Sequence, residues 1–210
     1  MEALKMPGNK LYDDFRIHDH LAAFPSDLDR HVTTKTFKRG SFIYQPAENM
    51  KYMFEVVEGA IKIGSYSDEG EEVTYDVLQK GDFFGNLKYL NGQFFEFSKT
   101  LVDTEVRLYE LSFFKSIIIN DLKVSEWFTF YLIKRWCSAE KKLLKMNSKS
   151  IHEKLNFLRQ HFGQRVEDIH HKSYVLFNLL TKKDLGDLVG TTRQTVASGL
   201  KKSEAAGCLT

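Results

Sequence analysis

The chain has 210 residues, of which 42% are hydrophobic and 28% are charged, and its formal net charge is +2. This composition is typical of a globular protein with one or two domains and argues against disorder. Its two cysteines, Cys137 and Cys208, have no metal-ligand spacing, and no apolar segment is long enough to span a bilayer. We therefore expect a reducing, cytoplasmic compartment, no disulfide framework and no membrane contact.

The charge is distributed unevenly along the chain. Residues 1–133 carry 15 Lys and Arg against 21 Asp and Glu, whereas residues 134–210 carry 15 against 7. The front therefore has a net charge of −6 and the rear +8. A basic rear favours a C-terminal module that faces a polyanion such as DNA, attached to a separate sensor. The alternative is that its basic helices are simply solvated.

The first 111 residues predict a short helical start and then a β domain. Residues 9–24 have the spacing of one or two helical turns. Between Val32 and Leu111 the apolar period changes to two, and turn signals such as Gly40, Gly59 and Gly81 separate short β-rich segments. About seven strands at this spacing predict an antiparallel barrel or sandwich of about 80 residues.

A long helix follows, and its pattern predicts two apolar faces. The β domain can cover one face, and we expect a second copy of the helix to cover the other, as in a coiled-coil dimer. The alternative is a helix buried within one chain. The predicted dimer stripe consists of Phe128, Leu132, Trp136, Ala139 and Leu143.

The C-terminal residues predict a helix-turn-helix. A further helix is expected over residues 151–162 and a short strand over 174–179. Thr181 and Asp184 then have the spacing of a capping box, which starts a helix. Gly190 supplies the tight turn, and the small Gly186 lets the two helices approach closely. Thr191 or Thr192 can cap the second helix.

The second helix of such a motif presents its first residues to the DNA major groove. We expect Arg193, Gln194 and Ser198 to read bases, since Arg pairs with guanine O6 and N7 and Gln with adenine N6 and N7. Phosphate contacts, which set register without reading sequence, are expected from Thr181, Thr192, Thr195, Lys201 and Lys202. As alternatives, the threonines cap helices and the lysines form a solvated face.

The order of β domain, long helix and helix-turn-helix resembles the Crp/Fnr family of bacterial transcription regulators. The block GDFFGNLKYL (residues 81–90) and the segment LTKKDLGDLVGTTRQTV (residues 180–196) carry this resemblance. It implies an α+β fold with an antiparallel double-stranded β-helix, the jelly-roll-like β-roll, as sensor over residues 1–121. A long dimerisation helix would span 122–148, and a winged-helix-like helix-turn-helix domain 149–210. The expected partners are double-stranded DNA, a second copy, RNA polymerase and a small effector.

The resemblance also tests which effector the roll could hold. Cyclic-nucleotide-binding relatives carry a glutamate for the ribose and an arginine for the phosphate, and a buried phosphate needs such a donor. Here Asn86 stands at the glutamate position, the arginine position falls near Glu96 and Phe97, and residues 40–106 contain no arginine. We therefore expect no cyclic AMP binding of the usual kind.

Other cofactors are also not expected. The family's iron–sulfur sensors need an N-terminal cysteine cluster, and residues 1–136 contain no cysteine. No histidine lies between His31 and His152, which argues against haem or a metal in the roll. The candidate effector pocket consists of Phe84, Gly85, Asn86, Leu87, Phe97, Ser98 and Lys99. Its aromatic side chains either fill the pocket or bind a small apolar or weakly acidic effector.

Three features depart from the family pattern. Gly199 and Ser203 occupy positions that are normally apolar, and the sequence stops at Thr210 where relatives continue into a winged hairpin, so the wing is expected to be truncated or absent. No enzyme motif is present, so we do not expect an enzyme. The resemblance predicts a homodimeric DNA-binding transcription regulator that reads a palindrome through residues 192–204. The alternative is a degenerate relative that binds a small ligand or a partner without reading DNA.

Overall fold

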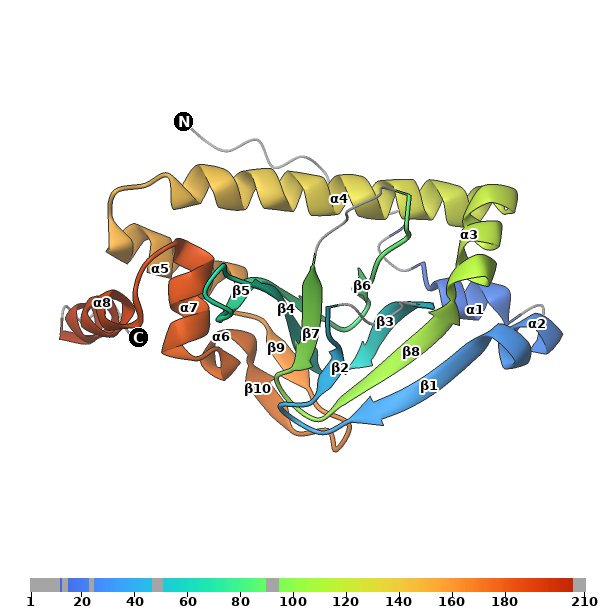
Figure 1. Ribbon diagram of the computed structural model, residues 1–210, viewed down its shortest axis with the longest axis horizontal. Helices are drawn as coiled ribbons and strands as arrows, with labels where there is room; N and C mark the ends of the chain where they lie inside the picture. Colours follow the sequence, from blue (N-terminus) through green and yellow to red (C-terminus); the bar gives the residue numbers. More distant parts are fainter. Residues whose placement is uncertain (1–11, 13–14, 23–24, 47–50, 90–94, 206–210) are drawn as a thin grey trace.

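The structure is a computed structural model that describes residues 12, 15–22, 25–46, 51–89 and 95–205, with side chains left out at 25–27 and 203–205. A β domain lies beneath one long helix, and the C-terminal helices pack against one end of it (Figure 1). Two short helices, α1 (Ile17–Leu21) and α2 (Pro25–His31), precede the first strand. α1 agrees with the helical start predicted over residues 9–24, whereas α2 lies beyond it; residues 9–11, 13–14 and 23–24 of that start lie outside the described residues.

The β domain, called the roll below, consists of two four-stranded antiparallel sheets. One sheet has the order β1 (Val32–Phe37), β8 (Thr104–Glu110), β3 (Tyr52–Glu58) and β6 (Phe83–Phe84). The other has the order β2 (Phe42–Tyr44), β7 (Glu96–Thr100), β4 (Ala60–Tyr66) and β5 (Glu72–Gln79). The alternation predicted these strands except β6, which at two residues is too short to show a period.

The core of the roll is aromatic at its centre. The rings of Phe54 and Phe84 stack with centroids 5.1 Å apart, and Tyr44 lies 5.3 Å from Phe54. Gly59 turns the chain between β3 and β4 with φ +101°, and a Cβ there would lie 2.5 Å from the Thr104 Oγ1. Only glycine fits this position without moving backbone.

The long helix α4 (Leu122–Met146) follows α3 (Leu111–Asn120) and starts at Asp121, whose carboxylate accepts from the Lys123 and Val124 amides. Its inner face holds α4 to the roll at Phe83 of β6. The Phe83 amide donates to the Tyr131 hydroxyl at 2.7 Å, and Arg135 donates to the Phe83 carbonyl at 2.9 Å. Tyr131 donates to the same carbonyl at 2.8 Å, so α4 replaces a strand neighbour for β6.

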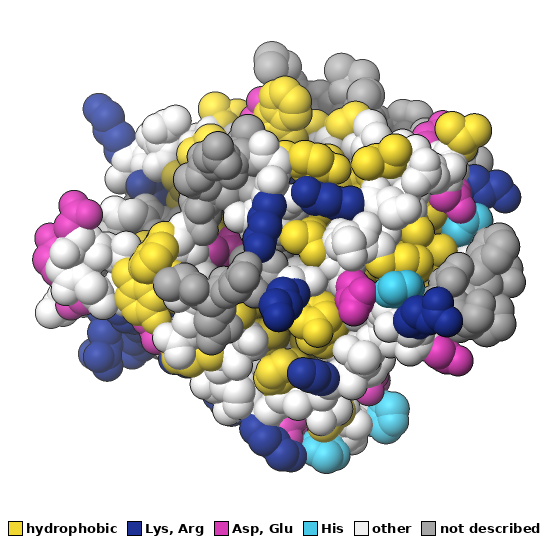
Figure 2. Space-filling view, turned by 45° about the vertical axis from the view of Figure 1, so that its right-hand side comes forward, with side chains coloured by type: hydrophobic (Ala, Val, Ile, Leu, Met, Phe, Trp, Pro, Cys, Tyr) yellow, Lys and Arg dark blue, Asp and Glu magenta, His cyan; other side chains and the backbone are white. Residues whose placement is uncertain are grey.

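The outer face of α4 carries exposed apolar side chains. Leu132, Trp136 and Leu143 are 49%, 67% and 68% exposed, and apolar side chains lie along the upper edge of Figure 2, where α4 runs. The predicted dimer stripe needs one correction, because Phe128 is only 6% exposed and packs on Phe114. A spacing of four residues turns about 40° around a helix at each step, so Phe128 lies on the inner face while Trp136 lies on the outer. Ala139 is exposed.

The C-terminal residues form α5 (Ile151–His161), a hairpin of β9 (Arg165–Glu167) and β10 (Ser173–Val175), then α6 (Leu176–Leu179), α7 (Lys182–Val189) and α8 (Arg193–Ala205). The strand predicted over 174–179 was wrong from residue 176 onward, where the chain is helical. It ends at Val175, because Leu176 and Phe177 are both buried and a strand would have placed them on opposite faces. No helix among the described residues is long and apolar enough to cross a membrane.

Candidate nucleic-acid interface and roll interior

The first helix of the helix-turn-helix, α7, begins with the predicted capping box. The Thr181 hydroxyl accepts from the Asp184 amide at 3.1 Å, and the Asp184 carboxylate accepts from the Thr181 amide at 2.9 Å. Leu185 and Val189 are buried beneath this helix. Two otherwise unpaired amides of the first turn are thereby satisfied, which stabilises the start of α7.

The turn between α7 and α8 depends on two glycines. Gly190 ends α7 in the left-handed region with φ 68°, and its amide donates back to Asp187 and Gly186 carbonyls. A Cβ on Gly186 would lie 2.7 Å from the Thr191 carbonyl oxygen, too close for any other residue. Both predicted roles are confirmed, because the chain needs αL geometry at one glycine and close approach at the other.

The second helix, α8, is capped by Thr192 and held by an apolar inner face. The Thr192 hydroxyl accepts from the Thr195 amide at 3.2 Å, and Val196 is fully buried. The predicted base-reading residues Arg193, Gln194 and Ser198 are all exposed. The helical repeat of 3.6 residues places Gln194 and Ser198 opposite Val196, so α8 presents a polar outer face.

The predicted phosphate-contacting residues are exposed too, and the structure divides them between two places. Thr195, Lys201 and Lys202 lie on α8 beside the base-reading residues, and Thr192 stands at its N-terminal end. Thr181 lies at the start of α7, where its capping partner Asp184 also contacts the roll. The capping alternative therefore holds for both Thr181 and Thr192, and it leaves a phosphate contact open.

Gly199 does not leave the cavity that its sequence position predicts. It is buried, and a Cβ there would lie 3.0 Å from Leu155 Cδ1 and 3.5 Å from Ile151 Cγ1 of α5. The side chains of α5 thus occupy the space that an aliphatic residue would take in α8. The Ser203 side chain and the region of the predicted missing wing lie outside the described residues.

The helix-turn-helix is docked on the roll through a buried carboxylate. Asp184, 2% exposed, accepts from Lys62 Nζ of β4 at 2.6 Å and from the Thr74 hydroxyl of β5 at 2.8 Å. Burial alone would raise the pKa of Asp184, but the hydrogen bonds from Lys62, Thr181 and Thr74 outweigh it and lower the pKa. The same carboxylate therefore starts α7 and fixes it to the sensor.

A second set of contacts supports this docking. Asp187, one turn further along α7, accepts from the Thr74 amide at 3.0 Å. Lys183 donates to the Glu72 carbonyl of β5 and pairs with Asp187 at 3.1 Å. The roll and the helix-turn-helix thus share polar contacts over two turns of α7.

A half-buried acidic group, Glu96, lies near the position at which the sequence comparison expected the arginine of cyclic-nucleotide-binding relatives. The Glu96 carboxylate accepts hydrogen bonds from the hydroxyls of Tyr44 and Tyr75. Burial raises the pKa of both tyrosines, and the charge of Glu96 raises it further. The Asn86 side chain, at the glutamate position, accepts from the Lys88 amide at 2.6 Å.

The predicted effector pocket divides between two faces of β7 and the turn after β6. The Ser98 hydroxyl is buried and, within the part of the chain that the structure describes, has no hydrogen-bond partner. Phe97 and Lys99 point to the opposite face, where Phe97 contacts Phe42 and Lys99 pairs with Glu72 at 3.1 Å. These two residues therefore do not line one pocket with Ser98, because successive strand residues alternate in direction.

The remaining residues of that predicted pocket lie in or after β6. Phe84 belongs to the aromatic core, Gly85 turns the chain with φ +111°, and Leu87 packs on the cluster beneath α4. The aromatic side chains here fill the roll rather than line an open chamber.

Sequence reasoning missed Arg135. Its guanidinium reaches from α4 to the roll, where it donates to Phe83 and pairs with Asp76 of β5 at 3.1 Å. Its charge partly offsets the rise in the pKa of Tyr44 and Tyr75. Its position, well beyond the strands in sequence, gave no signal of this. No group of three or more potential metal ligands occurs among the described residues.

Comparison with known proteins agrees with this architecture. Residues 34–121 match the cyclic nucleotide-binding domain family. The chain is 22% identical over 198 residues to the cAMP-activated global transcriptional regulator CRP of Haemophilus influenzae, covering 91% of this chain and 80% of that protein. The structure of FixK2 from Bradyrhizobium japonicum superposes with a TM-score of 0.65 at 21% identity, covering 84% of this chain and 86% of that one.

A putative Crp/Fnr regulator from Eubacterium rectale superposes with a TM-score of 0.68 at 17% identity, covering 92% of this chain and 88% of that one. The roll is thus a domain of the cyclic nucleotide-binding type. The Haemophilus influenzae and Eubacterium rectale proteins are both described as transcriptional regulators. In its fold and over most of its length, the chain is similar to members of the Crp/Fnr family of bacterial transcription regulators.

Proposed function

We propose that this protein is a cytoplasmic, homodimeric regulator that binds a palindromic DNA site through α8. The observation that carries the proposal is the outer face of α8, where Arg193, Gln194 and Ser198 are all exposed on a helix with an ordered cap and a buried inner face. Helices of this kind enter the major groove with their N-terminal residues against the bases. Arg193 reads guanine and Gln194 reads adenine.

The exposed stripe of α4 supports a dimer as the binding species. Leu132, Trp136 and Leu143 recur at spacings of four and seven on the outer face, and all are about half or more exposed. A two-fold axis along α4 buries this stripe against its copy and repeats α8 in the second half-site. An operator with two-fold symmetry follows from that arrangement.

The roll argues against a cyclic nucleotide as the effector. Glu96 would stand against the cyclic phosphate in place of the arginine that neutralises it, and two like charges at close range repel. The proposal includes no metal, haem or iron–sulfur cofactor. RNA polymerase remains a proposed further partner.

Selection of bound DNA from a random pool by the full-length protein tests this function. We expect enrichment of a palindrome whose half-sites lie about one helical turn apart. Binding that weakens with salt but enriches no motif would instead support a family member that no longer reads sequence, since charge alone produces such binding.

Two variants then separate base reading from phosphate contact. Arg193→Ala is expected to lower affinity for the selected site by about 1–3 kcal/mol and to relax one base position. Lys201→Ala, on the same exposed face, should weaken binding to selected and random DNA alike. Equal losses on both DNAs for both variants would contradict the assignment of Arg193.

A further inference from the structure

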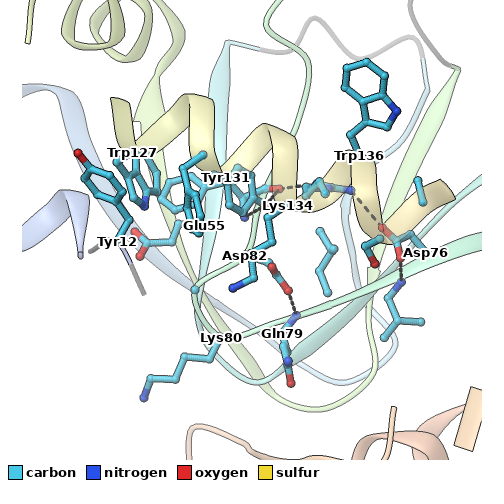
Figure 3. A pocket seen from close by; sticks show the side chains of 18 of the residues that line it. Tyr12, Glu55, Asp76, Gln79, Lys80, Asp82, Trp127, Tyr131, Lys134 and Trp136 are labelled. Atoms are coloured by element: carbon cyan, nitrogen blue, oxygen red, sulfur yellow. Dashed lines mark hydrogen bonds and ion pairs between the residues drawn. The ribbon is translucent and has the colours of Figure 1, made fainter. Parts of the chain in front are cut away.

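A cleft outside the roll interior opens between four parts of the chain, which are α4, the roll, the end of α5 and the N-terminal residues Tyr12, Phe15, Arg16 and Ile17. Its volume is about 830 Å³, within the range of small-molecule sites. α4 forms one wall, the end of β5 and its turn into β6 form the opposite wall, and the end of α5 closes one side at His161 and Phe162. Figure 3 shows Asp82 below Lys134 of α4, with the side chains of Gln79 and Lys80 extending away from that helix.

The charges that line the cleft leave an excess of cations. The Asp76 carboxylate lies between two of them, pairing with Arg135 at 3.1 Å and with Lys142. Arg16 and Lys134 add two more positive charges to the lining, whereas Lys80 is paired with Glu58 at 2.6 Å. The acidic Glu55 is already paired with Arg107 at 2.7 Å.

The other lining carboxylate does not reverse this balance. Asp82 accepts from the Gln79 amide at 2.9 Å, and burial raises its pKa, so its charge is disfavoured relative to an exposed carboxylate. At the end of α5, burial and then the charge of Lys142 lower the pKa of His161. Burial thus disfavours charge at both groups, and the contribution of Lys142 at His161 indicates positive charge beside the end of α5.

The remainder of the wall is aromatic. Trp127, Phe130 and Tyr131 follow one another along α4 on the cleft side, and Phe162 lies at the far end. The planes of Trp127 and Tyr131 are stacked, 22° apart, and Figure 3 shows both rings in this wall. An apolar body fits beside these rings, and an acidic group fits near Arg135 and Lys142.

We propose that this cleft is a binding site for a small organic anion, in which a carboxylate or phosphate is attached to an aromatic or apolar body. The acidic group contacts Lys142 and Arg135, and the body lies against the aromatic wall of α4. Because the roll, α4 and α5 all line the cleft, one bound molecule touches both the sensor and the helices that carry α8. This site is separate from the roll interior around Glu96.

The probe for this proposal is 8-anilinonaphthalene-1-sulfonate, a fluorescent aromatic anion, titrated into the full-length protein. We expect saturable binding that Lys142→Gln weakens by at least about fivefold, because one charge-assisted contact is lost. Ser138→Trp, which places a large side chain in the lining, should weaken it about tenfold or more. The matched controls, Lys141→Gln and Lys145→Trp, change exposed residues of α4 outside the lining and should leave binding unchanged.

The outcomes decide the proposal in each arm. Binding that is unaffected by both lining variants would place the dye outside the cleft and overturn the site. Equal losses in the lining variants and the controls would also overturn it. The uncharged analogue N-phenyl-1-naphthylamine has the same rings without the sulfonate and should bind at least about fivefold more weakly. Equal affinity for the two dyes would refute the anion preference.

Discussion

Replacing Asp184 by Asn should weaken the contact between the helix-turn-helix and the roll, and should lower stability more than a substitution on the surface does. The Asp184 side chain accepts from Lys62, Thr74 and Thr181, and Lys62 itself is only 14% exposed. Removing one partner of a buried pair costs about 3–5 kcal/mol, and the partial exposure of Lys62 favours the lower value. For a chain of this size, about 3 kcal/mol corresponds to a fall in Tm of roughly 6–12 °C.

A double-mutant cycle on thermal unfolding checks this value. Lys62→Met should lower Tm by a similar amount, and the double variant should cost less than the sum of the two, since each single change already breaks the pair. Lys182→Met, an exposed lysine in the first turn of α7, is the control and should change stability by no more than about 0.5 kcal/mol. A decrease in Tm of less than about 2 °C for Asp184→Asn would refute the reasoning. Strictly additive effects of the two single changes would refute it too.

The same pair predicts a dependence on pH. Because the pKa of Asp184 is lower in the folded protein than its ordinary value of 3.8, its contribution is complete above that value. It is lost as the pH falls through the lower, folded value. The Tm difference between wild type and Asp184→Asn should therefore be constant near neutral pH and shrink in acid.

Three further predictions concern other elements. Trp136→Glu on the exposed stripe of α4 should weaken self-association by at least about a hundredfold in sedimentation experiments, since burying two copies of a large apolar side chain contributes roughly 3–6 kcal/mol; an unchanged dimer would refute the role of the stripe. Gly199→Ile should lower the free energy of unfolding in urea by about 1–3 kcal/mol, because its Cβ already meets Leu155 at 3.0 Å, and a gain in stability would show a cavity instead. His161 should titrate below pH 6.5 by NMR, and Lys142→Gln should raise its pKa, whereas no change would exclude Lys142 as a cause.

Local sequence patterns were sufficient to predict the elements whose hydrogen-bonding partners lie within a few positions of one another. The capping box of Thr181 and Asp184 and the turn at Gly190 are local, so the sequence shows them directly. Alternation predicted the long strands for the same reason. β6 pairs over only two residues, and the helical turn at Leu176 is decided by tertiary burial, so neither had a local signal.

Contacts between distant segments could not be predicted. The second role of Asp184 depends on Lys62, which is 122 positions away, and the reach of Arg135 into the roll depends on how α4 lies on β6. Counting arginines within the strands therefore missed a cation that acts there. The apparent defect at Gly199 had the same origin, since the side chains of α5 that fill the space are invisible in the sequence of α8.

The bonds between α4 and Phe83 give the long helix a mechanical role. Tyr131 and Arg135 donate hydrogen bonds to the backbone of Phe83 on one side of α4, while Trp136 and Leu143 are exposed on the other. A rotation of α4 imposed at its outer face would therefore move Phe83 and the neighbouring turn at Gly85. In the opposite direction, a shift of that turn would rotate α4 about its axis and change the angle at which its apolar edge meets another surface.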